Sequence, residues 1–241
     1  MIKKIVQVSQ LGKFGDFGNQ LHQYAFARTY AEMHGAELQT PNWLGYRIFN
    51  LKHTPIKCQL PRTPLDKIPW GEVNIDLFGY FQNAEFFKKM DAEKMRSWFT
   101  FKDKWIDYPT PIIDTVAHLR RGDYVTKYPN VFCIIKKDSY FSARKRYRLN
   151  AISFVSQDEA LLDNKLDSDL MFMPDFLTMV RSNVLLRSNS TFGFWAGFFQ
   201  NKKVYSPKVK GLVGWSDVPF VEGNHSAICN ATDDIIFGEG S

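Results

Sequence analysis

Short apolar runs alternate with longer segments of helical periodicity along this chain of 241 residues. An apolar run over residues 2–8 is followed by a glycine-bearing loop, and the spacing of the next apolar residues predicts a helix from Asn19 to about His34. One face of that helix is expected to carry Leu21, Tyr24, Ala25, Arg28 and Ala31. A strand, a glycine-rich turn and a helix in this order predict the start of a βαβ unit.

The same alternation continues to the end of the chain. Further strands are predicted over residues 75–80, 113–119, 151–155, 184–186 and 203–205, and further helices over residues 84–99, 138–148 and 191–199. The last residues, 238–241, are expected to form a tail. Strands that alternate with helices predict an α/β fold with parallel sheets and helices on both faces. Ligands of such folds bind at loops beyond the carboxyl ends of the strands.

The sequence Pro109-Thr110-Pro111 interrupts the pattern and predicts a domain boundary. We therefore expect an N-terminal domain over residues 1–109 and a C-terminal domain over residues 110–241. The chain is long enough for two domains of ordinary size, and its 44% of hydrophobic residues, with 21 Phe, supply ample material for their cores.

Charge and cysteine content narrow the class of protein. The net charge of +6 fits a polyanionic partner or a phosphate-bearing ligand. Cys58, Cys133 and Cys229 lie far apart and show no CxxC spacing, which predicts neither a disulfide framework nor a cysteine zinc site and favours a reducing compartment. No apolar run approaches the roughly 18 residues of a membrane span, so we expect a cytoplasmic protein.

Two adjacent arginines, Arg120 and Arg121, follow the predicted strand that ends at Leu119. Two guanidinium groups side by side are costly to desolvate unless an anion meets them, and their planar forks match phosphate oxygens. Gly122 would permit a close backbone turn, and Asp123 could hold one guanidinium in place. The alternative is a surface ion-pair cluster of little energetic weight.

Two more loops follow predicted strands. The glycines of residues 12–20 permit close backbone approach, and the helix start behind them favours an anion, although the loop fits neither the G-x-G-x-x-G nor the Walker spacing. Residues 187–192 (Arg-Ser-Asn-Ser-Thr-Phe) offer hydroxyls and N–H groups for a phosphate, or merely a Ser/Thr helix cap.

Two further sequence features, an acidic triplet and a basic segment, point to functions other than a metal-free phosphate site. Asp167-Ser168-Asp169 has the D-x-D form that holds Mn²⁺ or Mg²⁺ in one class of nucleotide-sugar enzymes, but short acidic triplets are also common on surfaces. The basic segment 136–148 is interleaved with aromatic residues and could contact RNA or DNA. A helix with Tyr140, Phe141 and Tyr147 inward and its charges outward explains this segment as well, and we prefer that interpretation.

Taken together, the loops resemble motifs of the α1,2-type fucosyltransferases and, more distantly, of the α1,6 and protein O-fucosyl enzymes. The matching segments are residues 15–27 (GDFGNQLHQYAFA), 78–86 (FGYFQNAEF), 118–124 (HLRRGDY), 154–160 (FVSQDEA) and 188–197 (SNSTFGFWAG). They occur in the family's order and span most of the chain. The resemblance implies a GT-B fold, in which two Rossmann-like domains face each other across a cleft. The N-terminal domain would take the acceptor and the C-terminal domain the GDP-fucose.

The resemblance also implies residue roles. Arg120 would bind the β-phosphate and the leaving oxygen, with His118 and Arg121 ordering the loop and the donor. Asp158 would accept from the guanine N–H groups. The other donor contacts would come from Asn19, Gln20, Ser188, Asn189, Ser190, Thr191 and Phe192.

Such enzymes invert the anomeric centre, need no metal and transfer fucose to a glycan hydroxyl, here with an expected α1,2 linkage and no nucleic-acid partner. Asp16, His22 and Asp123 are the candidates for a general base. The loop over residues 12–20 is longer than the family's compact form, and the chain is shorter than many relatives between Tyr124 and Phe154. The alternatives are a transferase for another nucleotide sugar, or a non-catalytic nucleotide-binding or RNA-binding protein.

Overall fold

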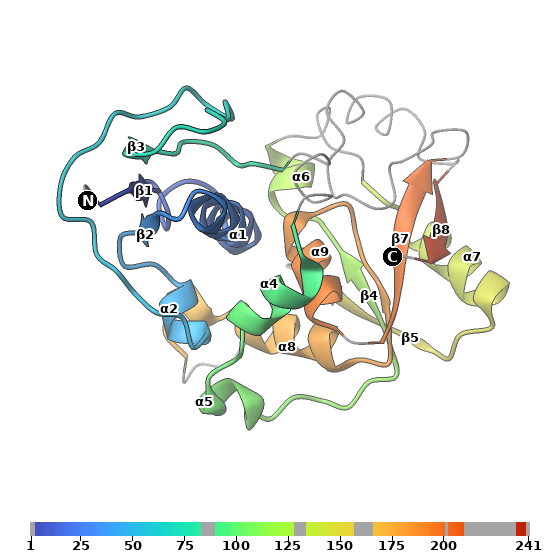
Figure 1. Cartoon of the computed structure of the whole chain (residues 1–241). Helices are drawn as coiled ribbons and strands as arrows, with labels where there is room; N and C mark the ends of the chain where they lie inside the picture. The colour runs from blue at the N-terminus through green and yellow to red at the C-terminus, as the bar shows by residue number, and fades with distance from the viewer. Residues whose placement is uncertain are drawn as a thin grey trace. The chain divides into compact units, whose positions relative to one another are not determined.

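The computed structural model describes residues 3–82, 90–127, 134–156, 166–200, 202–209 and 235–239. The chain forms two compact units, Met1–Tyr108 and Pro109–Ser241, here called the N-terminal and C-terminal units. Each has its own sheet, with helices packed against it (Figure 1). Among the described residues, no helix has the length and apolar character that a membrane crossing requires.

The N-terminal unit contains a three-stranded parallel sheet in the order β2-β1-β3. Its strands are β1 (Ile5–Gln7), β2 (Glu37–Gln39) and β3 (Ile75–Asp76). β1 and β3 are shorter than the predicted strands over residues 2–8 and 75–80. Helix α1 (Phe17–Met33) connects β1 to β2 and packs on both strands, as the βαβ pattern predicted.

Helix α1 begins at Phe17, two residues before the predicted start, because Asp16 takes the extended cap position. The first part of the helix is buried nearly all round. The ring of Tyr24 lies 5.3 Å from that of Trp43. Arg28, which was predicted to share a face with Tyr24, donates to the Tyr24 hydroxyl at 3.4 Å, and its guanidinium lies 4.4 Å from the centre of the Trp98 ring and is partly exposed.

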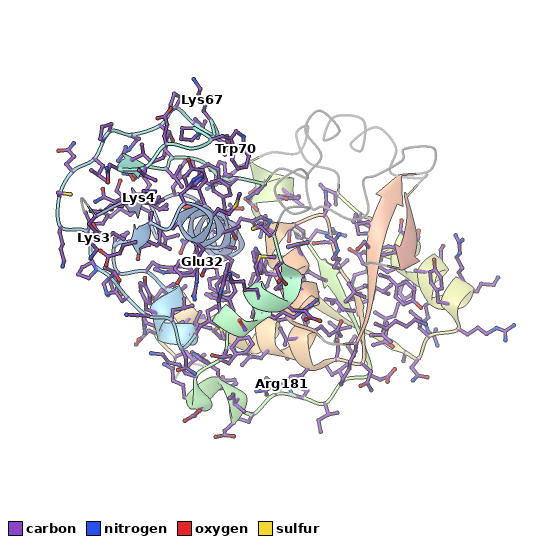
Figure 2. All side chains as sticks on the ribbon, viewed as in Figure 1. Lys3, Lys4, Glu32, Lys67, Trp70 and Arg181 are labelled. Carbon is purple, nitrogen blue, oxygen red and sulfur yellow. The ribbon has the colours of Figure 1, made fainter. Side chains whose placement is uncertain are left out.

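Three shorter described helices complete the unit: α2 (Gly45–Ile48), α4 (Ala92–Trp98) and α5 (Asp103–Ile106). Of the helix predicted over residues 84–99, residues 84–89 lie outside the described residues, and the rest is helical only in α4. Asp91 caps α4 by accepting a hydrogen bond from the Lys94 amide at 3.0 Å. The outer surface of the unit carries charged side chains such as Lys3 and Lys67 (Figure 2).

The C-terminal unit contains a five-stranded sheet in the order β5-β4-β6-β7-β8. Its strands are β4 (Thr115–Leu119), β5 (Ile152–Ser156), β6 (Val184–Leu186), β7 (Lys203–Val209) and β8 (Ile235–Glu239). All neighbours are parallel except β7 and β8. From β4 the chain first adds β5 on one side and then β6 on the other. The strand order therefore reverses between β4 and β6, which is where ligands bind in open α/β sheets.

The described helices of this unit are α6 (Asp123–Thr126), α7 (Lys137–Tyr147), α8 (Met173–Arg181), α9 (Thr191–Phe199) and the 3₁₀ turn η2 (Ser168–Leu170). On one face of the sheet, Ala117 and Leu119 of β4 share a core with Tyr140 of α7. On the other face, His118 contacts Phe192 of α9 and α8 packs on β4. The predicted helices on both faces are therefore present. Phe141, predicted to point inward from α7, is instead 46% exposed.

The predicted tail is wrong at Gly238 and Glu239, which belong to strand β8. They pair with Ser206 and Tyr205 of β7, which extends well past its predicted end. The side chain of Phe237 is buried in the core, with only 2% of its surface exposed, and this packing stabilises the strand. Its carbonyl also accepts a hydrogen bond from the Tyr147 hydroxyl at 2.5 Å. Residues 240 and 241 lie outside the described residues.

Replacing Phe237 by Ala should lower the free energy of unfolding of the C-terminal unit by about 3 kcal/mol, since it leaves a cavity in the core. Urea denaturation followed by circular dichroism measures the loss. The matched control is Phe141→Ala, which removes the same ring from a half-exposed site and should cost less than about 1 kcal/mol. Equal losses in the two variants would contradict a structural role for β8.

Candidate functional site

Two loops emerge side by side at the point where the strand order of the C-terminal unit reverses. β4 and β6 are parallel neighbours, with Ala117 paired to Leu186. The residues that follow each strand therefore leave the sheet at the same edge. The loop after β4 carries residues 118–123, and the loop after β6 carries residues 187–190, which lead into α9.

His118 and Ser188 connect the two loops. Nδ1 of His118 lies 2.8 Å from Oγ of Ser188, and both side chains are buried. The hydroxyl of Tyr140 donates to the His118 carbonyl at 2.7 Å and fixes the backbone at the same residue. A side chain at Gly193 would place its Cβ 2.7 Å from His118 Nδ1, so this packing requires glycine.

Burial lowers the pKa of His118 to about 3, and the positive charge of Arg120 contributes in the same direction. The imidazole is therefore neutral near pH 7. It serves here as a hydrogen-bonding and packing group for the loops and adds no charge to the site. The ordering role that the resemblance implies for His118 stays a prediction.

Arg120 is held from two sides. Its Nη2 donates to the carboxylate of Asp123, and its guanidinium carbon lies 4.8 Å from the centre of the Tyr124 ring. The backbone between them turns at Gly122 with a φ of 55°, a conformation that favours glycine. The side chain of Arg120 keeps 18% exposure, so a preoriented guanidinium faces the surface at this edge of the sheet.

Arg121 has a different environment from its neighbour. Its Nη1 donates to the Arg120 carbonyl and its Nη2 to the Ile135 carbonyl, both at 3.0 Å. These bonds tie the loop to the segment that precedes α7. Of the two adjacent arginines, Arg121 is therefore bound to the backbone of the loop and of the segment before α7, whereas the guanidinium of Arg120 remains partly exposed.

The loop after β6 ends as a capped helix start. Oγ of Ser190 accepts from the Gly193 amide at 3.2 Å, so the predicted cap is present. Thr191 and Phe192 form the first turn of α9, where backbone N–H groups and the helix dipole favour an anion. The hydroxyl of Tyr124 donates to the Asn189 carbonyl at 3.4 Å and makes a second connection between the loops.

Arg187 is the first residue after β6 and opens the loop that the sequence singled out, but no role was predicted for its guanidinium. It is 5% exposed, its Nε donates to the Ser206 hydroxyl at 2.7 Å, and its guanidinium carbon lies 5.6 Å from the centre of the Phe194 ring. Its signal was the same as that of Arg120: a cation directly after an apolar strand.

The candidates of the N-terminal unit surround the start of α1. Nε2 of Gln20 donates to the Gly15 carbonyl at 2.9 Å, and Oδ1 of Asn19 accepts from Gln82 at 2.7 Å. Asp16 is exposed at the helix cap position. His22 is buried, 3.0 Å from the Gly18 carbonyl, and burial lowers its pKa to about 3.

The structure adds no support for two other candidates, Asp158 and the Asp167-Ser168-Asp169 motif. Asp158 lies outside the described residues. Asp167 and Asp169 are exposed around η2. Within the part of the chain that the structure describes, no group of three His, Cys, Asp or Glu side chains is placed to hold a metal ion.

Neither a protein-family model nor a curated protein sequence matches this chain. Its fold is similar to solved structures of NodZ α-1,6-fucosyltransferase. One, soaked with GDP-fucose, aligns with a TM-score of 0.55 and 11% identity over 99% of this chain and 100% of that chain. Another, co-crystallised with GDP, aligns with a TM-score of 0.52 and 12% identity over 85% and 95%. NodZ from Bradyrhizobium gives a TM-score of 0.52, 11% identity and the same coverage. The chain thus has an α/β fold with parallel sheets that matches the NodZ fold.

The lowered pKa of His118 leads to a prediction about how the free energy of unfolding depends on pH. Its pKa is below the ordinary value of 6.5, so the unfolded chain binds a proton at this residue at pH values where the folded chain does not. The free energy of unfolding should therefore decrease as pH falls from 6.5 toward 3, by at most about 1.4 kcal/mol per pH unit from this group.

His118→Asn should remove that part of the pH dependence in urea denaturation curves of the C-terminal unit. His53→Asn changes an exposed histidine of the other unit and should leave it intact. An unchanged pH slope in His118→Asn would show that this imidazole titrates normally.

Proposed function

We propose that this chain is a glycosyltransferase that takes fucose from GDP-fucose and transfers it to a glycan hydroxyl. The observation that carries the proposal is the convergence of Arg120 and the start of α9 at the point where the strand order reverses. A guanidinium and a helix N-terminus at one edge together form a site for a diphosphate. The fold likeness to NodZ supports the same donor, since one of those structures was soaked with GDP-fucose.

Arg120 is the residue we assign to bond breaking. Cleavage of the sugar–phosphate bond leaves a growing negative charge on GDP, and a guanidinium already oriented by Asp123 and Tyr124 neutralises it without reorganisation. In this proposal, Asp123 positions Arg120. His118 and Arg121 keep the loop in the conformation that presents the guanidinium.

The loop after β6 completes the proposed donor site. The backbone N–H groups of Thr191 and Phe192 hold a phosphate, and the Ser188 and Ser190 hydroxyls fix the loop around them. Asn189 contributes through its side chain, and Asp158 accepts from guanine. Asn19 and Gln20 approach the donor from the N-terminal unit in the proposed GT-B arrangement.

The acceptor side belongs to the N-terminal unit in this proposal, and the reaction inverts the anomeric centre without a metal. Among the three candidate bases, His22 is buried and Asp123 is paired with Arg120, whereas Asp16 is exposed. We therefore assign acceptor deprotonation to Asp16. The motif over residues 118–124 favours an α1,2 linkage, whereas the NodZ structures are named α-1,6 enzymes. Linkage analysis of the product separates the two.

Ligand-induced thermal shifts test the donor. At about 100 times Kd, GDP and GDP-fucose should each add roughly 2.7 kcal/mol, or several degrees at about 2–4 °C per kcal/mol, with EDTA present. UDP and UDP-glucose are the controls and should give no shift. A shift that requires UDP species and Mn²⁺ would overturn the proposal and favour a metal at Asp167 and Asp169.

Arg120→Ala should reduce the rate of transfer from GDP-fucose by about 10²–10³-fold, because it removes the guanidinium that meets the leaving phosphate. Arg120→Lys keeps the charge and should recover only part of the rate. Arg144→Ala removes an exposed arginine of α7 and should leave the rate unchanged. Transfer that is intact in Arg120→Ala contradicts the assignment.

A further inference from the structure

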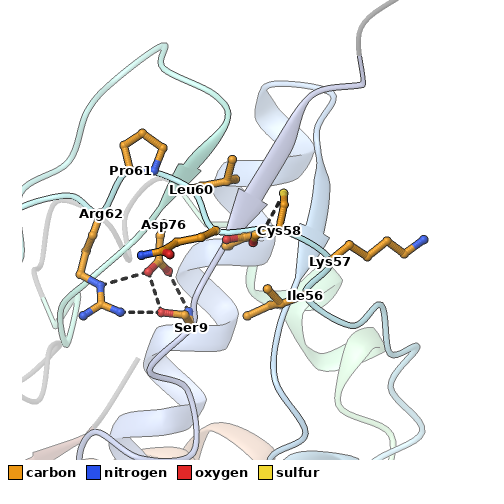
Figure 3. Close-up of a pocket in the computed structure, with 10 residues that line it drawn as sticks. Ser9, Ile56, Lys57, Cys58, Leu60, Pro61, Arg62 and Asp76 are labelled. Carbon is orange, nitrogen blue, oxygen red and sulfur yellow. Dashed lines mark hydrogen bonds and ion pairs between the residues drawn. The ribbon is translucent and has the colours of Figure 1, made fainter.

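A cavity of about 770 Å³ lies at the carboxyl ends of β1 and β3 in the N-terminal unit (Figure 3). It lies where the strand order of this sheet reverses, since β1 is the first strand and has β2 on one side and β3 on the other. Its lining residues are Gln7, Ser9, Ile56, Lys57, Cys58, Gln59, Leu60, Pro61, Arg62 and Asp76. The proposed function uses none of these residues.

The face of the sheet beneath the cavity is polar. Gln7, Gln39 and Asp76 are register partners on the three strands, so their side chains share one face, and each is at most 4% exposed. Parallel sheets are usually apolar on both faces, so this buried polar row needs hydrogen bonds to offset its desolvation. Nε2 of Gln7 donates to Gln39 Oε1 at 3.1 Å and to the Cys58 carbonyl at 2.9 Å.

Arg62 is oriented at one wall of the cavity. Its Nε donates to Asp76 Oδ2 at 3.0 Å and its Nη2 to Ser9 Oγ at 2.8 Å (Figure 3). The Phe78 ring lies 5.4 Å from its guanidinium carbon. No described contact engages Nη1, and the side chain is 45% exposed. The guanidinium is thus held in place with one edge open to a ligand.

The lining favours an anionic and hydroxylated ligand. It carries two cations, Lys57 and Arg62, and a single carboxylate, Asp76, which is already paired. Among the described residues, no hydrogen bond reaches Oε1 of Gln7, so this buried oxygen can accept from a hydroxyl. Ile56, Leu60 and Pro61 offer apolar surface for C–H groups. No lining residue is aromatic, which disfavours a nucleobase because bases bind by stacking.

We propose that this cavity binds an acidic sugar. The carboxylate of the sugar pairs with the open edge of Arg62, and a hydroxyl donates to Gln7 Oε1. A guanidinium fork with one fixed edge suits a carboxylate, and the apolar segment 56–61 packs against the ring. That the sugar belongs to the acceptor glycan rests on the proposed function; the binding itself does not.

Cys58 provides the readout, because its exposed thiol lines the cavity. The full chain is alkylated with N-ethylmaleimide, and the rate at Cys58 is followed by peptide mass spectrometry, with Cys133 and Cys229 as internal references. Glucuronate, glucose and inorganic phosphate are compared at equal concentration and ionic strength. At about ten times its Kd, glucuronate should slow alkylation of Cys58 about tenfold, since only the free protein reacts.

The variants locate the binding groups. Arg62→Lys keeps the charge beside Asp76 but loses the fork, so the full protein is expected to fold. It should raise the glucuronate concentration that halves the alkylation rate about tenfold, the loss of one charge-assisted hydrogen bond. Lys57→Gln removes an exposed cation whose side chain extends away from Arg62 (Figure 3) and should leave that concentration near the parent value. Lys67→Gln changes an exposed lysine of the same unit outside the cavity, and in this variant glucuronate should protect Cys58 as well as in the parent protein.

Protection by glucose equal to that by glucuronate, equal protection by phosphate, unchanged protection in Arg62→Lys or no protection at all would each overturn the proposal. Thermal shifts with GDP in the same preparation test the donor site separately. Loss of the GDP shift with retained protection of Cys58 contradicts the proposed function alone.

Discussion

The parallel pairing of β4 with β6 is the constraint on which the proposed donor site depends. It brings residues 118–123 next to residues 187–190, although His118 and Ser188 lie 70 residues apart in the sequence. The contact between His118 and Ser188 and the bond from Tyr124 to the Asn189 carbonyl then fix the loops to each other. Because β5 lies on the other side of β4, the strand order reverses at this edge.

Three polar side chains of these loops have environments that are compatible with their burial or partial burial. His118 is neutral, Arg187 donates to Ser206, and Arg121 donates to two backbone carbonyls. Such contacts offset the cost of removing polar groups from water, and they fix the geometry of the loops before any ligand arrives. Preorganisation of this kind lets a guanidinium such as Arg120 stabilise developing charge without a cost of rearrangement.

The N-terminal unit differs from the C-terminal unit in that its sheet has a row of buried polar residues on one face. Its sheet has only three described strands, and α1 covers one face with the help of aromatic rings. The opposite face carries Gln7, Gln39 and Asp76 in a row, where an apolar layer would otherwise be expected. The bonds among Asp76, Ser9 and Arg62 stabilise this row and also leave a cavity lined by polar groups. The two units therefore present polar sites at equivalent positions, next to the first strand of each sheet.

The sequence alone determined the elements whose signals are local. The predicted strand over residues 184–186 and helix over residues 191–199 match β6 and α9, because apolar runs and a Ser cap act within a few residues. Strand β8 escaped prediction, since a short segment with a glycine becomes a strand only when β7 pairs with it. The sequence also indicated that Asp123 could hold one of the two guanidinium groups. Only the tertiary structure decided that this group is Arg120, that Arg121 donates to the Ile135 carbonyl, and that Gln7, Gln39 and Asp76 share one sheet face. The physical reason is that the periodicity of apolar residues indicates which residues are buried. The hydrogen-bond partners of a polar residue depend instead on strand register and on segments that are distant in sequence.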